Sequence, residues 1–277
     1  GKNSDSKLPK KIIENKKVII KFPEDISQNL KRTIENFIYF LSIIAASAIL
    51  ISGIGLKNSL YSFFSNNQLN IAIHESQSRI YENQLARSRP FTDWLFSQMK
   101  DAFGDLGVLD ADGFYRAVNS VKNGYIRTES DELQYNLHIM LRYDLERELI
   151  AGDLMVNDLE AAWNDRFRAD FGYAVPKASL GMLQDIHWSE CLIGYFPTYA
   201  IGNIYAACLR EAMLKDAPNA IDALAEGRTD TARTWLRENG QQHGRRYKAQ
   251  EVIEKATGQA ASSEPFVRYI REKFAEL

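Results

Sequence analysis

The chain has 277 residues, of which 45% are hydrophobic and 25% are charged, a composition typical of a protein that buries a substantial core. This composition excludes a largely disordered chain. The formal net charge of −2 argues against nucleic acid as a partner, because a phosphate-binding surface normally carries an excess of Lys and Arg.

The charge balance changes sharply near residue 73. Residues 1–73 contain 10 basic and 5 acidic side chains, a formal charge of +5, whereas residues 74–277 contain 24 basic and 31 acidic side chains, a formal charge of −7. A domain boundary can produce such a shift, although no Gly-, Pro- or Ser-rich linker marks this one. We therefore predict that two segments of different character meet at residue 73.

The segment 37–56 is a run of twenty residues without a charge. At about 1.5 Å rise per residue, a helix of this length spans roughly 30 Å, the thickness of the hydrocarbon core of a bilayer. We predict a transmembrane helix here, and hence a single-pass membrane protein; a buried helix of a soluble protein is the alternative. The basic arm 1–36 carries eight Lys and one Arg and would lie on the cytoplasmic side.

Residues 31–73 also carry a resemblance to a known family. The sequence ENFIYFLSIIAASAILISGIGLKNSLYSFF, followed by NNQLNIAI, resembles the FtsX-like permeases of ABC transporters. The resemblance implies one permease span followed by an exit segment, residues 57–73. Because one span cannot form a multi-span transporter subunit, we do not expect this chain to transport a substrate by itself.

Residues 74–277 show helical periodicity almost throughout. Leu137, Leu141, Leu145 and Leu149 recur at four-residue spacing and form an apolar stripe beside a charged face. Glycines mark the helix ends, and Ser, Asp or Pro residues mark the starts. The expected helices are 74–88, 90–103, 112–123, 130–150, 157–171, 184–214, 217–226, 230–238, 247–256 and 265–276. Since no convincing alternating strand is present, we predict a mainly α fold.

Three short segments of this helical part combine several polar side chains. They are HESQ at 74–77, IRTESD at 126–131, and GMLQDIHW at 181–188, which YFPTY follows at 195–199. Each has a simple structural explanation: an ion-paired helix face, helix capping by Thr128 or Ser130, and a buried, hydrogen-bonded His187. Together the three segments are less easily explained by chance, and they indicate a polar cleft.

These segments give residues 74–277 a specific resemblance to the carboxypeptidase Taq family of zinc metallocarboxypeptidases. HESQ is similar to the family's HES(G)Q motif, and GMLQDIHW fits GxxQDxHW at every fixed position. IRTESD is similar to IRxxAD, with Ser130 in place of the usual alanine. YFPTYAIGNIYAA and EPFVRYI also look like family sequence. The resemblance implies a helical, N-terminally truncated carboxypeptidase domain, from a family whose members are cytoplasmic and commonly dimeric.

The resemblance implies a role for several residues. Glu75 corresponds to the third zinc ligand, and zinc is the implied cofactor. Arg127 is the candidate for binding the C-terminal carboxylate of a peptide substrate, for which a planar guanidinium is well suited. His187 and Tyr199 are candidate catalytic residues that donate hydrogen bonds to a peptide carbonyl or to the oxyanion. Two further residues, Gln184 and Asp185, are candidates for substrate binding and for orienting His187.

The family's HExxH, HPF and DxRxT motifs are absent from the chain. In HExxH, two histidines one helical turn apart bind one zinc ion, and the glutamate between them acts as general base. The four histidines are His74, His138, His187 and His243, and no two of them are four residues apart. We therefore expect neither tight zinc binding nor peptide hydrolysis by the chain as written.

Two classes of function follow from these observations. The first is a metallocarboxypeptidase homologue that is inactive as written. The second is a single-pass membrane protein, or permease fragment, whose helical domain binds a partner without catalysis. A fusion that arose by gene rearrangement and has no function of its own is a third possibility.

Overall fold

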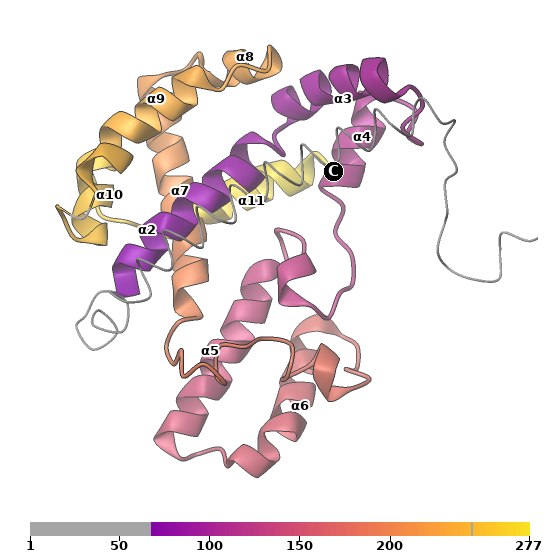
Figure 1. Cartoon of the computed structure of the whole chain (residues 1–277), viewed down its shortest axis with the longest axis vertical. Helices are drawn as coiled ribbons and strands as arrows, with labels where there is room; N and C mark the ends of the chain where they lie inside the picture. Colours follow the sequence, from indigo (N-terminus) through magenta and orange to yellow (C-terminus); the bar gives the residue numbers. More distant parts are fainter. Residues whose placement is uncertain (1–67, 245) are drawn as a thin grey trace, which may run out of the picture. The chain divides into compact units, whose positions relative to one another are not determined.

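The computed structural model describes residues 68–244 and 246–277. These two ranges consist of helices and turns and contain no β-strand (Figure 1), which confirms the predicted mainly α fold. The predicted arm 1–36, the predicted span 37–56 and most of the segment 57–73 lie outside the described residues. Within the described part, no helix combines the length and the apolarity needed to cross a bilayer.

A π-helix, η1 (Ile80–Leu85), directly continues the first helix of the described residues, and the longest connection, residues 172–196, lies between α6 and α7. The α-helices are α2 (Gln68–Arg79), α3 (Arg89–Phe103), α4 (Ala111–Val118), α5 (Tyr135–Ala151), α6 (Leu159–Phe171), α7 (Pro197–Asp216), α8 (Ala220–Ala225), α9 (Asp230–Asn239), α10 (Ala249–Thr257) and α11 (Glu264–Ala275). Because α2 runs through residues 73 and 74, the change in composition falls inside a helix.

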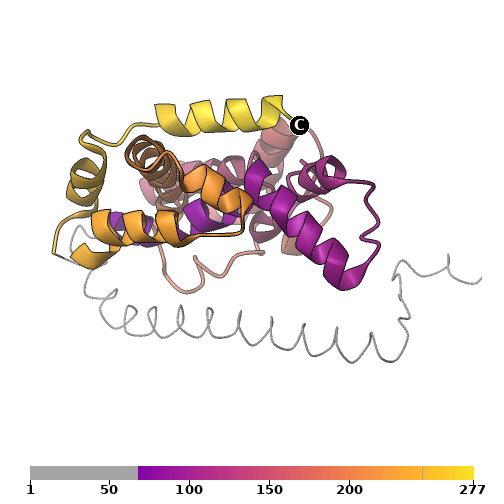
Figure 2. The same ribbon diagram turned by 90° about the horizontal axis from the view of Figure 1, so that it is seen from above.

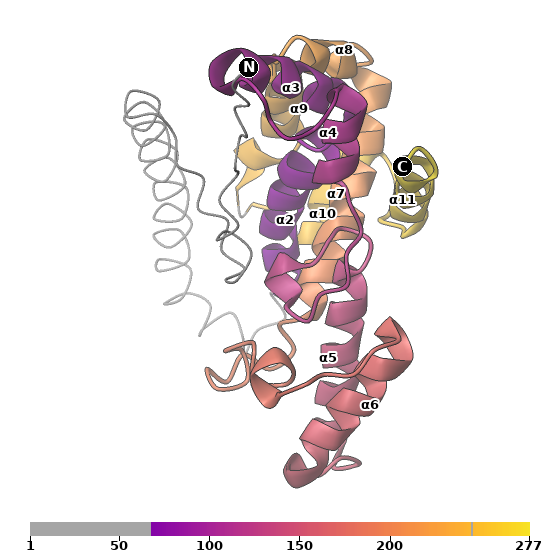
Figure 3. The same cartoon turned by 90° about the vertical axis from the view of Figure 1, so that its right-hand side faces the viewer.

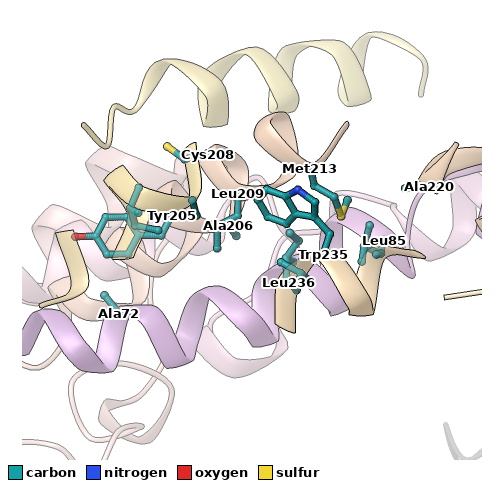
Figure 4. Close-up of a cluster of buried hydrophobic side chains, with 14 of the residues drawn as sticks. Ala72, Leu85, Tyr205, Ala206, Cys208, Leu209, Met213, Ala220, Trp235 and Leu236 are labelled. Atoms are coloured by element: carbon teal, nitrogen blue, oxygen red, sulfur yellow. The ribbon is translucent and has the colours of Figure 1, made fainter. Parts of the chain in front are cut away.

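Helices α2 and α7 pack against each other and form the centre of the described part (Figures 1 and 3). Helices α9, α10 and α11 also contact α7, and α11 crosses α7 rather than running parallel to it (Figures 2 and 3). The main apolar cluster includes Tyr205, Leu209 and Met213 of α7 and Trp235 of α9 (Figure 4). Each large apolar side chain buried in this way contributes about 1.5–3 kcal/mol relative to an exposed one.

A glycine allows α2 and α7 to approach closely. A Cβ atom at Gly202 would lie 2.6 Å from Cγ of Glu75 and 3.2 Å from its backbone carbonyl carbon. Both distances are shorter than a van der Waals contact, so any side chain at Gly202 would push α2 away from α7. The absence of a side chain at Gly202 therefore sets the distance between Glu75 and α7.

Helices α5 and α6 form a pair with an apolar cluster of their own (Figure 1). Leu141 and Leu145 of the predicted apolar stripe are buried in this cluster together with Phe167. Both helices end where the sequence predicts, at Gly152 (φ 81°) and Gly172 (φ 83°). These are left-handed backbone conformations that glycine adopts without a steric cost.

The predicted helix 184–214 is wrong in its first half. Residues 181–196 form irregular turns, and α7 begins only at Pro197. Cys191 has φ 57° and Gly194 has φ 75°, values that are incompatible with a right-handed helix. Proline fits the first turn of a helix but not its interior. The segment GMLQDIHW (181–188) therefore lies in a loop. We call residues 181–196 the site loop.

The predicted helix 130–150 begins later than expected, at Tyr135. Neither Thr128 nor Ser130 caps it; instead, the Asp131 carboxylate accepts a hydrogen bond from the backbone N–H of Gln134, at 2.9 Å. The predicted helix 74–88 changes to π-helical geometry at Ile80. The Asp131 contact is local, whereas the π-helical turn places the carbonyl of Asn83 against Tyr269 of α11, a contact that local periodicity does not contain.

Candidate functional site

Three chain segments supply the candidate site residues. Glu75 lies in α2, and Arg127 lies in a short 3-10 turn, η2 (Arg127–Glu129), ahead of α5. Gln184, Asp185 and His187 lie in the site loop, which leads directly into α7 and Tyr199. The structure thus brings together residues that are up to 124 positions apart in the sequence.

Asp185 is the centre of the site, because it binds two arginines at once. Its Oδ1 accepts a hydrogen bond from Nη2 of Arg127 at 2.7 Å, and its Oδ2 accepts one from Nε of Arg142 at 2.6 Å. Arg127 is 6% exposed and Arg142 is fully buried. We call these three residues the arginine–aspartate cluster. Two guanidinium groups share one carboxylate, so the cluster carries one net positive charge.

The ionisation of this cluster follows from burial and pairing. Burial raises the pKa of Asp185, but hydrogen bonds and charges from Arg127 and Arg142 outweigh it, so that the pKa lies below its usual value. Burial lowers the pKa of Arg142 to about 10 despite its contact with Asp185. Burial also lowers the pKa of Arg127, but the hydrogen bonds that Arg127 donates to Asp185 outweigh this effect, so that the pKa is raised overall. All three groups are therefore charged at neutral pH.

Gln184 holds the Arg127 turn against the site loop. Its side-chain oxygen accepts the backbone N–H of Arg127 at 2.8 Å. Its side-chain nitrogen donates to the carbonyl oxygens of Tyr125 at 2.9 Å and Leu180 at 3.1 Å. Both ends of the amide therefore contact backbone groups, and these contacts set the position of Arg127.

His187 and Tyr199 form a hydrogen-bonded pair beside the arginine–aspartate cluster. Nε2 of His187 lies 2.9 Å from the hydroxyl of Tyr199, and Nδ1 lies 3.8 Å from Oδ1 of Asp185. The nearby carboxylate favours a hydrogen on Nδ1, which makes Nε2 the acceptor of the Tyr199 hydroxyl. Burial lowers the pKa of His187 to about 4, so the ring is neutral at pH 7. Burial also raises the pKa of Tyr199, which keeps the phenol protonated.

Glu75 is ion-paired with Arg79. Its Oε1 accepts a hydrogen bond from Nε of Arg79 at 2.6 Å. The Arg79 guanidinium carbon lies 4.1 Å from the ring centroid of Tyr135, and the Tyr135 hydroxyl accepts a hydrogen bond from Arg127 at 3.1 Å. A continuous chain of contacts therefore links Glu75 to Arg127.

The described residues do not form a zinc site by themselves. A structural or catalytic zinc ion needs three or four nitrogen, sulfur or carboxylate ligands. In the described ranges, no three His, Cys, Asp or Glu side chains gather in an arrangement that could hold a metal ion. Glu75 would supply one ligand only.

A polar pocket of about 430 Å³ opens beside the Arg127 turn. Arg127, Thr128 and Ser130 line it from the turn, and Arg79 and Tyr135 line it from the two adjoining helices. Arg127 thus has its guanidinium in the buried cluster and part of its surface in an open pocket. Four basic side chains (Arg79, Arg87, Lys122 and Arg127) and three acidic ones (Glu82, Glu129 and Asp131) line the pocket, so an anion there would meet a small excess of positive charge.

Sequence reasoning missed Arg142, the second partner of Asp185. A signal was present, because His138, Arg142 and Glu146 recur at four-residue spacing next to the leucine stripe, and all three are buried. The Glu146 carboxylate accepts a hydrogen bond from Nε1 of Trp188 at 2.8 Å. A polar row beside an apolar stripe at the same helical spacing therefore indicates a buried polar network rather than a solvent-exposed face.

Comparison with known families and proteins gives a consistent result. The profile of the carboxypeptidase Taq (M32) metallopeptidases matches residues 53–274. The thermostable carboxypeptidase 1 of Thermus thermophilus is 35% identical over 223 residues, which are 80% of this chain and 44% of that protein. That of Pyrococcus furiosus is 37% identical over 206 residues, 74% of this chain and 41% of that protein.

Solved structures show the same likeness. The M32 carboxypeptidase from Deinococcus radiodurans R1 matches with a TM-score of 0.72 and 41% identity, over 74% of this chain and 42% of that one. Trypanosoma cruzi metallocarboxypeptidase 1 matches with a TM-score of 0.71 and 31% identity, over 74% of this chain and 43% of that one. The chain spans less than half the length of these relatives. The family match begins at residue 53, within the segment 31–73, whose resemblance to FtsX-like permeases stays a prediction.

Proposed function

The chain belongs to the carboxypeptidase Taq (M32) metallopeptidase family, and from this premise we propose that it carries the part of a metallocarboxypeptidase cleft that recognises the C-terminus of a peptide. The observation that supports this proposal is the arginine–aspartate cluster, whose net positive charge lies beside the pocket of about 430 Å³. A buried, positively charged group is a strong partner for a carboxylate.

Arg127 is the proposed carboxylate-binding residue. A guanidinium has five N–H donors on three nitrogens, and the contacts of Arg127 with Asp185 and Tyr135 use one hydrogen on each of Nε, Nη1 and Nη2. The second hydrogens on Nη1 and Nη2 remain for a ligand. Asp185 holds the guanidinium and Gln184 holds the backbone of the turn. This fixed orientation lowers the entropy lost when a peptide binds.

The His187–Tyr199 pair is the proposed hydrogen-bond donor to the peptide carbonyl. Because the pKa of Tyr199 is raised, its hydroxyl keeps its proton and can turn from Nε2 of His187 to a substrate oxygen. A neutral His187 makes this exchange easier, since no charge is stranded when the hydrogen bond breaks. In a complete active site this hydroxyl would stabilise the oxyanion of the tetrahedral intermediate.

We do not assign hydrolysis to the chain by itself. The sequence has no pair of histidines four residues apart, and Glu75 is held by Arg79. Without a bound metal ion, water in the cleft would keep its high pKa and would be a poor nucleophile. We therefore propose that the chain binds peptide C-termini without turnover and has no tight zinc site.

A binding experiment tests the recognition proposal. A short fluorescent peptide with a free C-terminal carboxylate should bind roughly tenfold more tightly than the same peptide with a C-terminal amide, because only the carboxylate forms charge-assisted hydrogen bonds. Fluorescence anisotropy measures both dissociation constants. Arg127→Gln should abolish the preference, and it should leave a folded chain because Asp185 keeps Arg142 as a partner.

Arg116→Gln is the matched control for this experiment. Arg116 is an exposed arginine that is also paired with an aspartate, Asp112, but it lies outside the pocket lining. The control variant should keep the preference for the free carboxylate. Equal binding of the acid and the amide by the unsubstituted chain would contradict the proposal.

An activity assay tests the absence of turnover. We expect no release of C-terminal amino acids above background when zinc or cobalt is added to the purified chain. Robust turnover that Glu75→Ala abolishes would overturn this part of the proposal, because it would mean that Glu75 and other groups hold a working metal ion.

Membrane attachment through residues 37–56 is a separate proposal that rests on the uncharged run of twenty residues. It predicts that the expressed chain floats with membranes in a density gradient and that deletion of this run releases it. A full-length product that stays in the soluble fraction would contradict it.

A further inference from the structure

A cluster of buried polar groups lies where α11 meets the rest of the molecule. Nζ of Lys273 lies 2.7 Å from Oε2 of Glu132, and the side chains of both residues are 5% exposed. Tyr269, one helical turn before Lys273, places its hydroxyl 3.1 Å from Nζ and 3.2 Å from the same carboxylate oxygen. None of these groups belongs to the site described above.

The cluster also binds a backbone carbonyl of the π-helix. The carbonyl oxygen of Asn83 accepts hydrogen bonds from the hydroxyl of Tyr269 at 3.0 Å and from Nζ of Lys273 at 3.1 Å. An ammonium group has three hydrogens, and Lys273 directs them to Glu132, Tyr269 and Asn83. The π-helical turn exposes this carbonyl to side chains of α11, and π-helical turns are frequent at functional sites.

The two segments that α11 joins are those that carry the candidate site. Asn83 follows Glu75 and Arg79 along the same continuous helical segment, α2 and η1. Glu132 lies five residues after Arg127, in the loop between η2 and α5. Asn83 and Glu132 are 49 residues apart, and Lys273 lies 141 residues after Glu132. Through these contacts, α11 connects two segments that are distant in the sequence, outside the arginine–aspartate cluster.

We propose that Lys273 and Tyr269 are positioning residues, through which α11 fixes the Arg127 turn relative to the helix that carries Glu75 and Arg79. The proposal rests on the proposed function where it concerns peptide binding. Its structural content, that α11 sets the position of the Arg127 turn, can be measured without a peptide. The buried ammonium group of Lys273 needs its partners, because a buried charge without them is costly.

Backbone amide hydrogen exchange in the full chain tests this content. The N–H of Arg127 donates to Gln184, so its exchange rate reports the position of the turn. Lys273→Met should raise the exchange rate of Arg127 by about tenfold relative to Leu209 in the centre of α7, because the turn opens locally. Lys273→Arg keeps a cation and its donors and should stay within roughly threefold of the unsubstituted chain.

Ile253→Ala is the matched control for lost stability. Ile253 is fully buried in the main apolar cluster on α10, away from the Arg127 turn, and its truncation creates a cavity. The control should change exchange at Leu209 more than at Arg127, the reverse of Lys273→Met. Tyr269→Phe, which removes only the hydroxyl, should change Arg127 in the same direction as Lys273→Met and supplies the test if that variant fails to fold.

Peptide binding gives the second readout. In Lys273→Met the preference for a free C-terminal carboxylate over an amide should fall by about tenfold, since a displaced guanidinium loses its charge-assisted hydrogen bonds, whereas Ile253→Ala should keep it. If Lys273→Met and Tyr269→Phe raise the exchange rate of Arg127 no more than that of Leu209, as expected for Ile253→Ala, the positioning role is refuted. If the unsubstituted chain shows no preference, the proposed function has failed, and the exchange comparison still decides the role of α11.

Discussion

At the residue scale, Asp185 decides whether the site can exist, because it compensates two buried cations. We expect Asp185→Asn to lower the free energy of unfolding by about 3–5 kcal/mol, since it leaves the guanidinium groups of Arg127 and Arg142 buried without a counter-charge. Urea unfolding followed by circular dichroism measures the change.

Asp112→Asn is the matched control for Asp185→Asn. Asp112 also lies between two arginines, Arg89 at 2.7 Å and Arg116 at 2.7 Å, but all three side chains are exposed to solvent. Exposed ion pairs contribute little, because water and salt screen them, so the control should unfold at nearly the same urea concentration as the unsubstituted chain. Similar losses in both variants would mean that burial does not set the strength of the Asp185 contacts.

At the element scale, the close approach of α2 and α7 at Gly202 sets the distance between Glu75 and α7. Gly202→Ala should destabilise the fold by about 1–3 kcal/mol, because the new Cβ overlaps both the side chain and the backbone of Glu75 and the helices must separate. Chemical unfolding measures the loss, and weaker protection of the α2 amides against hydrogen exchange would locate it.

Gly113→Ala applies the same substitution where space is available. Gly113 lies in α4, and a Cβ there would lie 3.5 Å from the Asp110 carboxylate, an ordinary contact. Alanine lowers the backbone entropy of the unfolded chain, so we expect this control to be stabilising by roughly 0.5–1 kcal/mol. If the two substitutions had the same sign, the close approach at Gly202 would not be the cause.

At the scale of the whole molecule, two buried histidines make stability depend on pH. Burial lowers the pKa of His138 to about 3, assisted by the charges of Arg142 and Arg127 and opposed by Asp185. Burial likewise lowers the pKa of His187 to about 4. In the unfolded chain both rings titrate near pH 6.5. Between these values the unfolded state binds more protons than the folded state, so stability falls as the pH falls.

We expect the free energy of unfolding to decrease between about pH 6.5 and pH 4 by up to roughly 1.4 kcal/mol per pH unit for each histidine. Below about pH 4, protonation of Asp185 should add to this loss, because its pKa is lowered in the fold. Urea unfolding at a series of pH values measures the slope. His138→Leu should reduce the slope by about half, and an unchanged slope would mean that His138 is protonated in the folded state.

Much of the fold follows from the sequence, but less of the site geometry does. Leucine spacing predicts α5, Gly152 and Gly172 predict helix ends, and the HESQ, IRTESD and GMLQDIHW segments indicate which parts of the chain meet. The arrangement within the site was not predictable in the same way. Arg142 as the second partner of Asp185, and Arg79 as the partner of Glu75, are contacts that no single motif contains.

The sequence by itself determined the helical periodicity, the glycine caps and the polar motifs, because these depend on residues within a few positions of one another. Only the tertiary structure decided that the site loop is not helical, that α2 changes to a π-helix at Ile80, and that Lys273 joins Asn83 to Glu132. The physical reason is that these features are stabilised by partners 40 or more residues away, as the 43 residues between Arg142 and Asp185 illustrate. A buried charge takes the partner that the packed chain brings to it, and local sequence patterns do not specify which partner that is.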